Sequence, residues 1–399
     1  MNSNWKQLFE ILQKPTRLII GLMSGTSLDG LDIALCSVKG AGPATNIKVL
    51  EFTTVPYTEE FKIEVKSVFS KRAADLQMIC LMNEKIGLQH AELVLEALKS
   101  WGRTADEIDV IASHGQTIFH APETLHGLID YPNATLQIGD GDHIAVKTGI
   151  ITIADFRQKH LAAGGEGAPL AVYGDYLLFS KAGEDRIMLN IGGIANFTYL
   201  PGDNDAKKVF STDVGPGNTM MDQYIQQQYS GLYFDENAAI ASQGVVNEAL
   251  LTVLLENEFL AADFPKTTGP ELFNLHYLSA AQAKSGTSNL KQADVLATLC
   301  ACSARIIVNA IQQCFGTSAK PYIYMSGGGM HNPLLVSMLK AGLPEAKFGT
   351  TADLGIDPDA KEAVLFALLA NETLVGEKTD FGDREGVPSI RMGKICLPD

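Results

Sequence analysis

Positive charge is scarce in this 399-residue sequence, in which 31 lysines and arginines face 46 aspartates and glutamates and the formal net charge is −15. Because nucleic acids and anionic membranes bind basic surfaces, this balance argues against both kinds of partner. Any phosphate group that the protein binds must be held by a local set of residues. We therefore expect no nucleic-acid partner and no membrane partner.

Several sequence signatures of enzymes and metal sites are also missing. There is no G-x-x-x-x-G-K-[ST] phosphate loop, no G-x-G-x-x-G after an expected strand and no protein-kinase signature. The six cysteines lack Cys-x-x-Cys spacing, which argues against a zinc or redox site. They are predicted to be free thiols packed in the core of a protein from a reducing compartment.

Long hydrophobic runs of the targeting type are absent as well. Residues 1–17 are interrupted by polar residues and lack the apolar run and cleavage site of a secretory signal, so we expect a short helix there. The most apolar later stretch, Leu296 to Phe315, carries Ser303, Arg305 and Asn309, which would be costly in lipid. It is predicted to be a buried amphipathic helix, and the protein is predicted to be cytoplasmic.

What the sequence does contain is a pair of matching strand, glycine turn and strand patterns. In the first, Arg17 to Val38, an apolar run breaks at a Gly/Thr/Ser loop that begins at Gly25 and then resumes. Glycine lets the backbone approach a ligand closely, and hydroxyls beside free N–H groups suit an anion, although one such pattern alone could be an ordinary turn. The second, Arg186 to Leu200, repeats the plan around Gly192-Gly193. The repetition predicts two similar lobes that close on one ligand.

Further polar residues follow short buried strands. A strand ending at His114 is expected to place this residue and Gln116 where open α/β sheets bind ligands, although a structural hydrogen bond is the alternative role for the histidine. Asp155 and Arg157 end another strand, where opposite charges could pair with each other or bind a polar substrate. Residues 161–170 hold three glycines and a proline, which predicts a hinge or a substrate loop.

Asp213 is the candidate general base. A strand predicted over residues 208–213 stops there and a tight turn leads into a helix, so the carboxylate should face the ligand. The alternative is that it bonds the backbone of its own turn. Gly327 to Gly329 end a later strand, where a base or ribose could lie against bare backbone. Three glycine turns at strand ends together indicate a nucleotide with its phosphates between the lobes.

Together these motifs resemble the anhydro-N-acetylmuramic acid kinase family. The resemblance covers nearly the whole chain and is carried by GLMSGTSLDGLD from Gly21 to Asp32, SHGQT, ADFR, GGEGAPL, NIGGIAN, DVGPGN, KTTG and the glycines at 327–329. It implies an α/β fold of two actin-like (ribonuclease-H-like) lobes, each a mixed five-stranded sheet flanked by helices, with an interlobe cleft. Residues 1–156 and 357–399 are expected to form lobe one, and residues 157–356 lobe two.

The resemblance implies an ATP-dependent kinase. It would transfer the γ-phosphoryl group of ATP to O6 of 1,6-anhydro-N-acetylmuramic acid while water opens the anhydro bridge, giving N-acetylmuramic acid 6-phosphate and ADP in cell-wall sugar recycling. Mg²⁺ would bridge phosphate oxygens, and a homodimer is also implied. Two alternatives stay open: a levoglucosan-type anhydrosugar kinase, and a non-catalytic actin-like nucleotide-binding protein, which the presence of Asp213 disfavours.

The resemblance also implies roles for individual residues. Asp213 matches the catalytic base that activates the water. The expected ATP-binding residues are Gly25, Thr26, Ser27, Leu28, Asp29, Gly30, Leu31, Asp32, Gly192, Gly193, Gly215, Gly217, Asn218, Gly327, Gly328 and Gly329. The expected substrate-binding residues are His114, Gln116, Asp155, Arg157, Gly165 and Gly167. Glu362 matches an acidic residue near the metal. Because the first loop lacks the aspartate that most relatives of the wider superfamily place before its glycine, Asp29, Asp32 and Glu362 are the candidate metal ligands.

Overall fold

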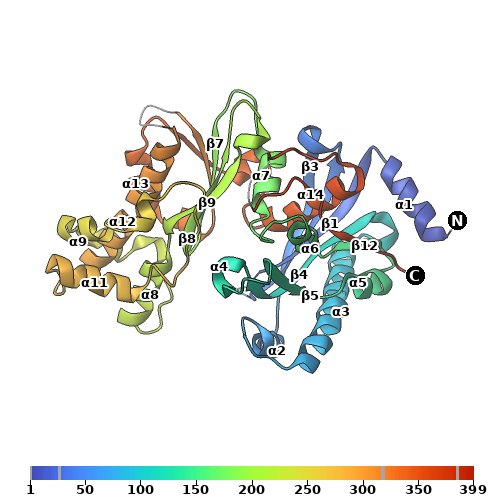
Figure 1. Cartoon of the computed structure of the whole chain (residues 1–399), viewed down its shortest axis with the longest axis horizontal. Helices are drawn as coiled ribbons and strands as arrows, with labels where there is room; N and C mark the ends of the chain where they lie inside the picture. Colours follow the sequence, from blue (N-terminus) through green and yellow to red (C-terminus); the bar gives the residue numbers. More distant parts are fainter. Residues whose placement is uncertain (1, 26–27, 316–319, 383–385) are drawn as a thin grey trace. The chain divides into compact units, whose positions relative to one another are not determined.

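The computed structural model describes residues 2–25, 28–315, 320–382 and 386–399. The chain divides into two compact units, which are drawn in Figure 1. Unit 1 comprises Met1–Phe179 and Gly355–Asp399, and unit 2 is the continuous segment Ser180–Leu354. The predicted α/β class with two lobes, each built on a mixed sheet, is confirmed. The interlobe cleft stays a prediction.

Unit 1 is built on a sheet in which an antiparallel meander continues into parallel strands. The strand order is β12-β6-β4-β1-β2-β3, with β5 paired to β4. Strand β1 is antiparallel to β2 and parallel to β4, which is parallel to β6. The strands are β1 (Thr16–Ser24), β2 (Gly30–Lys39), β3 (Asn46–Pro56), β4 (Val110–Ala121), β5 (Ala134–Ile138), β6 (Thr152–Ala154) and β12 (Lys394–Cys396). Among the described residues this sheet has seven strands rather than the predicted five, because β5 and β12 add antiparallel pairs to β4 and β6.

Helices cover both faces of this sheet. They are α1 (Ser3–Gln13), α2 (Glu59–Val68), α3 (Leu76–Ser100), α4 (Glu123–His126), α5 (Gly141–Thr148), α6 (Phe156–Ala162), α7 (Ala171–Phe179) and α14 (Lys361–Val375). Helix α14 passes β1 so closely that a β-carbon on Gly21 would lie 1.9 Å from the Ala363 carbonyl oxygen, so only glycine fits there. Because side chains alternate along a strand, the flanking Ile20 and Leu22 point to the other face, where they join Ile86 of α3 in a buried cluster.

Unit 2 repeats the same plan. Its strand order is β11-β10-β7-β8-β9, in which β7, β8 and β9 form an antiparallel meander and β10 is parallel to both β7 and β11. The strands are β7 (Arg186–Ile191), β8 (Ile194–Leu200), β9 (Phe210–Pro216), β10 (Tyr322–Ser326) and β11 (Lys347–Thr350). The two glycine patterns therefore correspond to the β1–β2 and β7–β8 turns, as the repetition in the sequence predicted.

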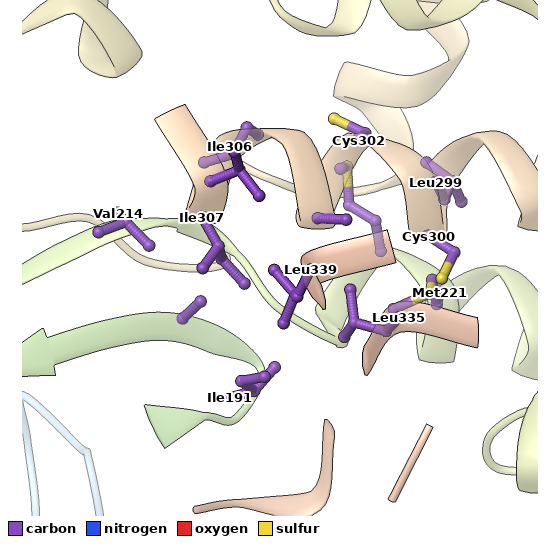
Figure 2. Close-up of a cluster of buried hydrophobic side chains, with 14 of the residues drawn as sticks. Ile191, Val214, Met221, Leu299, Cys300, Cys302, Ile306, Ile307, Leu335 and Leu339 are labelled. Carbon is purple, nitrogen blue, oxygen red and sulfur yellow. The ribbon is translucent and has the colours of Figure 1, made fainter. Parts of the chain in front are cut away.

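Helix α12 is the core helix of unit 2. The helices of this unit are α8 (Thr219–Gln228), α9 (Glu248–Leu254), α10 (Glu258–Ala261), α11 (Leu275–Ser285), α12 (Gln292–Phe315) and α13 (Pro333–Gly342). Figure 2 shows Ile306 and Ile307 of α12 in one buried cluster with Val214 of β9 and Leu339 of α13. Within the described ranges, α12 is the one helix long and apolar enough to cross a membrane, but 83% of that window is buried inside the protein. The predicted buried amphipathic helix is confirmed.

The boundary between the units lies later in the chain than predicted. Residues 157–179 belong to unit 1 rather than to the second lobe. Long-range polar contacts hold this segment there, because Arg157 donates to His114 at 2.9 Å and Lys361 pairs with Asp175 at 2.8 Å. The glycine-rich segment predicted as a hinge therefore lies within unit 1.

Two strands extend past their predicted ends at the candidate site. Strand β4 continues beyond His114, because after Gly115 (φ 73°) its second half pairs with β5, so His114 and Gln116 lie inside the strand. Strand β9 runs to Pro216, so Asp213 lies within it and is paired with β8 instead of standing on a turn. In both cases the longer strand pairs along its added residues with a strand next to it in the chain, β5 for β4 and β8 for β9.

All six cysteines are free thiols. Cys36, Cys300 and Cys302 are buried, and Cys314 and Cys396 are partly buried. Cys80 on α3 is exposed, so the prediction of core packing was wrong for this residue.

Candidate active site

Two leucines at the turn between β1 and β2 have buried side chains. Leu28 and Leu31 point into the core of unit 1 and are at most 1% exposed, so only their main chain can meet a ligand. Leu28 has a left-handed φ of 60° and donates its N–H to the Gly25 carbonyl at 3.3 Å. Among the other predicted ATP-binding residues of this region, Asp29 is exposed, Gly30 and Asp32 belong to β2, and Thr26 and Ser27 lie outside the described residues.

Asp32 lies in an acidic environment beside this turn. Burial raises the pKa of its carboxyl group. A hydrogen bond from the Thr54 hydroxyl at 2.6 Å lowers that pKa, and the negative charges of Asp359 and Asp29 raise it further. The environment of Asp32 is therefore short of positive charge.

Glu362 stands in the first turn of α14, as predicted. The protein packed around it raises the pKa of its carboxyl group, against the positive charges of Lys361 and Arg157, and Asp32 adds to the rise. Its side chain nevertheless remains accessible to solvent, so the raised pKa reflects surrounding protein rather than full enclosure. It is thus an acceptor that a ligand can reach.

The described residues of unit 1 supply some of the ligands of a magnesium ion but not a complete set. In the part of the chain that the structure describes, no three His, Cys, Asp or Glu side chains converge as a complete metal site. Mg²⁺ usually keeps several waters and is bound through one or two carboxylates plus substrate phosphates. The repulsion between Asp32 and Glu362 would be relieved by a divalent cation, so these carboxylates suit such a shared site.

Arg157, in the first turn of α6, is held by two acceptors. Its Nε donates to His114 Nε2 at 2.9 Å and its Nη1 to the Gly167 carbonyl at 2.6 Å. His114 Nδ1 lies 3.0 Å from the Gly115 carbonyl, so that nitrogen carries the proton and the ring is neutral. Burial, followed by the charge of Arg157, lowers the pKa of His114 well below its ordinary value, which agrees with this assignment.

The guanidinium of Arg157 keeps one edge available. Burial lowers its pKa to about 10, so it stays protonated at neutral pH. Its Nη2 group makes no hydrogen bond to any residue in the described ranges. A planar cation with a free edge can bind a carboxylate.

Asp155 does not pair with Arg157, although the two residues are only two positions apart in the sequence. Its carboxylate pairs with Lys394 of β12. With His114 and Asp140 it lines a cavity of about 190 Å³ within unit 1. The two charged residues predicted to bind the sugar therefore have different partners: Asp155 pairs with Lys394, and Arg157 contacts His114.

Gly165 and Gly167 both contact His160, a residue that the sequence did not identify as part of the site. A β-carbon on Gly165 would lie 2.2 Å from the His160 ring, and Gly167 donates its N–H to His160 Nδ1 at 3.0 Å. His160 is 1% exposed, so it supports this loop from the protein interior. A single histidine on a short helix carries no sequence signal that would have identified it.

Gln116 is engaged at both ends of its amide. Its Oε1 accepts from the Ser24 hydroxyl, and its Nε2 donates to the carbonyls of Gly25 at 3.3 Å and Thr117 at 3.1 Å. The side chain is 1% exposed. In this structure Gln116 therefore holds the β1–β2 turn, a role different from the predicted sugar contact.

In unit 2, the β7–β8 turn is tied to the start of α8. Gly217 and Thr219 donate their N–H groups to the Gly193 carbonyl at 2.9 and 3.0 Å, and Asn218 donates to the Gly192 carbonyl at 2.8 Å. The amides of Gly217 and Asn218, predicted to contact phosphate, are thus already occupied. The backbone N–H groups of the turn itself and the Asn218 side chain are the remaining candidates.

Some glycines of unit 2 have a packing reason and others do not. A β-carbon would lie within 2.9 Å of protein atoms at Gly215, Gly327 and Gly329, so packing requires glycine there. It would meet nothing closer than 3.5 Å at Gly192, Gly193 and Gly328, and none of these three has a positive φ. A ligand that lies against the backbone would account for glycine at these open positions.

Asp213 has one carboxylate oxygen held and one free. Its Oδ2 accepts the Thr268 N–H at 2.9 Å, and its own N–H donates to the Lys266 carbonyl at 2.9 Å. The segment Lys266–Gly269, noted in the sequence without a role, therefore orients it. Its Oδ1 makes no hydrogen bond within the described ranges. Burial raises the pKa of Asp213 against the Thr268 hydrogen bond, and Glu271 adds to the rise, so the group is suited to accept a proton.

Comparison with known proteins gives one consistent result. Residues 17–387 match the family model described as anhydro-N-acetylmuramic acid kinase. The chain is 57% identical to the anhydro-N-acetylmuramic acid kinase of Pseudoalteromonas atlantica and 53% identical to that of Pseudoalteromonas translucida, in each case over 401 aligned positions that cover 100% of both chains. Among solved structures, a Schistosoma mansoni hexokinase complexed with glucose is similar at a TM-score of 0.35 and 9% identity, with 88% of this chain and 85% of that chain covered.

Proposed function

Because the chain belongs to the anhydro-N-acetylmuramic acid kinase family, we propose that it uses ATP to phosphorylate 1,6-anhydro-N-acetylmuramic acid while water opens the anhydro bridge. The products are N-acetylmuramic acid 6-phosphate and ADP. The observation that carries the proposal is the match along the entire chain, at 57% identity, to a relative of that name. The presence and geometry of Asp213 support it further.

Asp213 acts as the base in this reaction. Its free oxygen takes a proton from water, and the water oxygen forms a bond to the anomeric carbon as the bond from that carbon to O6 breaks. O6 forms a bond to the γ-phosphorus as the bond from phosphorus to the bridging oxygen breaks, and ADP leaves. The proton on Asp213 then returns to solvent, so atoms and charge balance.

Arg157 is the residue that recognises the muramic sugar. The lactyl group of this sugar carries a carboxylate, and the free Nη2 edge of Arg157 supplies the matching charge. His114 holds the guanidinium in place instead of contacting the sugar. The loop of Gly165 and Gly167 and the Asp155 carboxylate complete the proposed sugar contacts.

Backbone groups hold the nucleotide in the proposal. The segment Gly25 to Asp32 and the Gly192-Gly193 turn contact the phosphates, and the open surface at Gly328 receives the adenosine. Mg²⁺, when bound, offsets the charge that develops on the transferring phosphoryl group. Asp29, Asp32 and Glu362 are the carboxylates that would hold it.

We extend the proposal to a cytoplasmic homodimer. Six free thiols fit a reducing compartment, and the buried α12 is a core helix. The dimer rests on the family resemblance alone, and light scattering from the purified protein measures it directly.

Oxygen labelling tests the proposed reaction. In ¹⁸O-labelled water with ATP and the anhydro sugar, mass spectrometry should find the label on the anomeric hydroxyl and none in the phosphate. The first-formed sugar should be the anomer with water opposite the departing bridge oxygen. Label in the phosphate would mean that water attacks phosphorus, and the protein would then be an ATPase. Levoglucosan, which lacks the lactyl carboxylate, is the control substrate and should compete poorly.

A further inference from the structure

We propose that His90 and Tyr57 are positioning residues for the phosphates of ATP, because they end a directed chain of hydrogen bonds that holds the β1–β2 turn through Ser24 and Gln116. The inference rests on the proposed function, since it gives that turn its ligand. Sequence analysis assigned no role to Tyr57 or His90, and neither belongs to a motif.

The four side chains come from four separate segments of unit 1 and all are buried. His90 lies on α3 and is 0% exposed, and Tyr57 follows β3 and is 4% exposed. Ser24 ends β1 and Gln116 lies on β4, each 1% exposed. His90 Nε2 lies 3.0 Å from the Tyr57 hydroxyl, which lies 2.9 Å from Ser24 Oγ, which in turn contacts Gln116 Oε1.

The direction of the hydrogen-bond chain follows from the number of protons that each side chain can donate. Gln116 Nε2 points at two carbonyls, those of Gly25 and Thr117, so its Oε1 must be the end that faces Ser24. The single hydroxyl proton of Ser24 is therefore donated to Gln116. The Tyr57 proton is then donated to Ser24.

Only one tautomer of His90 completes this order. Because the Tyr57 proton is already used, His90 must carry its own proton on Nε2 and donate it to the tyrosine oxygen. Nδ1 of the same ring is buried without a partner in the described part of the chain. A buried nitrogen without a hydrogen bond lowers the stability of the fold. A histidine at this position therefore indicates that the hydrogen bond from Nε2 to Tyr57 is needed.

Tyr57 holds the turn at both of its ends. Its hydroxyl bonds Ser24 before the turn, and its backbone N–H donates to the Asp29 carbonyl after it at 3.2 Å. Gln116 meanwhile donates to the Gly25 carbonyl within the turn. These hydrogen bonds thus fix Ser24, Gly25 and Asp29, the described residues at the two ends of the turn, so a phosphate that binds there meets a backbone already ordered at both ends.

A purely structural role is the competing interpretation, and nucleotide selectivity separates the two. Tyr57→Phe keeps the ring that packs on Phe61 at 4.6 Å between centroids and removes the hydroxyl from the chain. It should raise the dissociation constant of a non-hydrolysable ATP analogue about five- to tenfold. The dissociation constant of adenosine, which has no phosphate, should stay within about twofold.

Substitutions of His90 test the donor itself. His90→Gln keeps an N–H at the position of Nε2 and should bind the analogue like the parent, whereas His90→Met fills similar space without a donor and should resemble Tyr57→Phe. Tyr277→Phe is the matched control, since it removes a tyrosine hydroxyl that donates to the Leu254 carbonyl at 2.7 Å within unit 2. It should leave the affinities for both nucleotides unchanged.

The outcomes distinguish this inference from the proposed function. Equal weakening of analogue and adenosine, or no change in either, would overturn the inference, as would loss of binding in His90→Gln with retention in His90→Met. If Tyr57→Phe does not fold, the two His90 variants decide. A parent protein that binds the analogue but does not phosphorylate the sugar would overturn the proposed function and leave the inference standing, whereas a parent that does not bind the analogue would overturn both.

Discussion

At the scale of single residues, the site depends on which polar atoms are already occupied. Gln116 and His114 use their polar atoms to hold the β1–β2 turn and Arg157. Asp213 and Arg157 each keep one group without a protein partner in the described residues. These free groups support the catalytic role proposed for Asp213 and the carboxylate-binding role proposed for Arg157.

The pH dependence of turnover tests Asp213. Only its ionised form accepts a proton, so kcat/KM should be full above the pKa of Asp213 and fall as the pH drops through it. Because burial raises that pKa above the ordinary 3.8, the acid limb should lie above pH 3.8. Asp213→Asn should lower turnover by about 10² or more, keep ATP binding and abolish this limb.

A stability measurement shows that such a loss is not misfolding. A group whose pKa is raised in the folded state contributes stability that is present below its unfolded pKa and is lost as the pH rises through its folded pKa. At pH 7 the ionised Asp213 therefore opposes folding, and Asp213→Asn should unfold at a temperature no lower than that of the parent. Turnover within a few-fold of the parent would contradict the catalytic role of Asp213, and a lower unfolding temperature would contradict its raised pKa.

At the scale of elements, each unit places a glycine-containing turn between its first two strands. In unit 2 this turn and the start of α8 bind each other through backbone hydrogen bonds. The segment after β10 adds Gly328, which has open space, next to Gly329, which does not. Adjacent glycines therefore serve different purposes.

Two alanine substitutions separate these purposes. Gly328→Ala adds a methyl group into open space, so the unfolding temperature should not change while ATP affinity falls about tenfold. In Gly329→Ala the new β-carbon would lie 2.3 Å from Ile191 Cγ2, so this variant should unfold at a lower temperature. Calorimetry and a binding titration on both proteins measure the difference. Unchanged ATP affinity in Gly328→Ala would remove the adenosine assignment.

At the scale of the whole molecule, both units contain an antiparallel meander that continues into parallel strands. Unit 2 is a continuous segment with its own sheet and its own buried cluster around α12 (Figure 2). Unit 1 is assembled from the two ends of the chain, and α14 from the C-terminal part packs on strands from the N-terminal part.

Fragments test the boundary between the units. Residues 180–354 alone should give a cooperative thermal transition by circular dichroism, because their core is complete. Residues 157–356, the boundary expected from sequence, carry α6 and α7 without the partners that bury them and should aggregate. A cooperative transition in the longer fragment only would contradict the division at Phe179.

The sequence by itself determined the class, the repeated turns and the buried α12, and it supplied the candidate site residues. Each of these follows from short-range pattern: apolar periodicity defines a strand or helix, and a glycine between two strands marks a turn. The family resemblance added the expected reaction, because each of its motifs is a short run of neighbouring residues that can be recognised without the fold.

Only the tertiary structure decided which of those residues are free to act. Gln116 meets Ser24 across 92 residues, and Tyr57 meets His90 across 33. Thr268 orients Asp213 across 55 residues, and the contact between Lys361 and Asp175 keeps α7 in unit 1. No local pattern encodes such pairs, because they form only when segments from distant parts of the chain pack together.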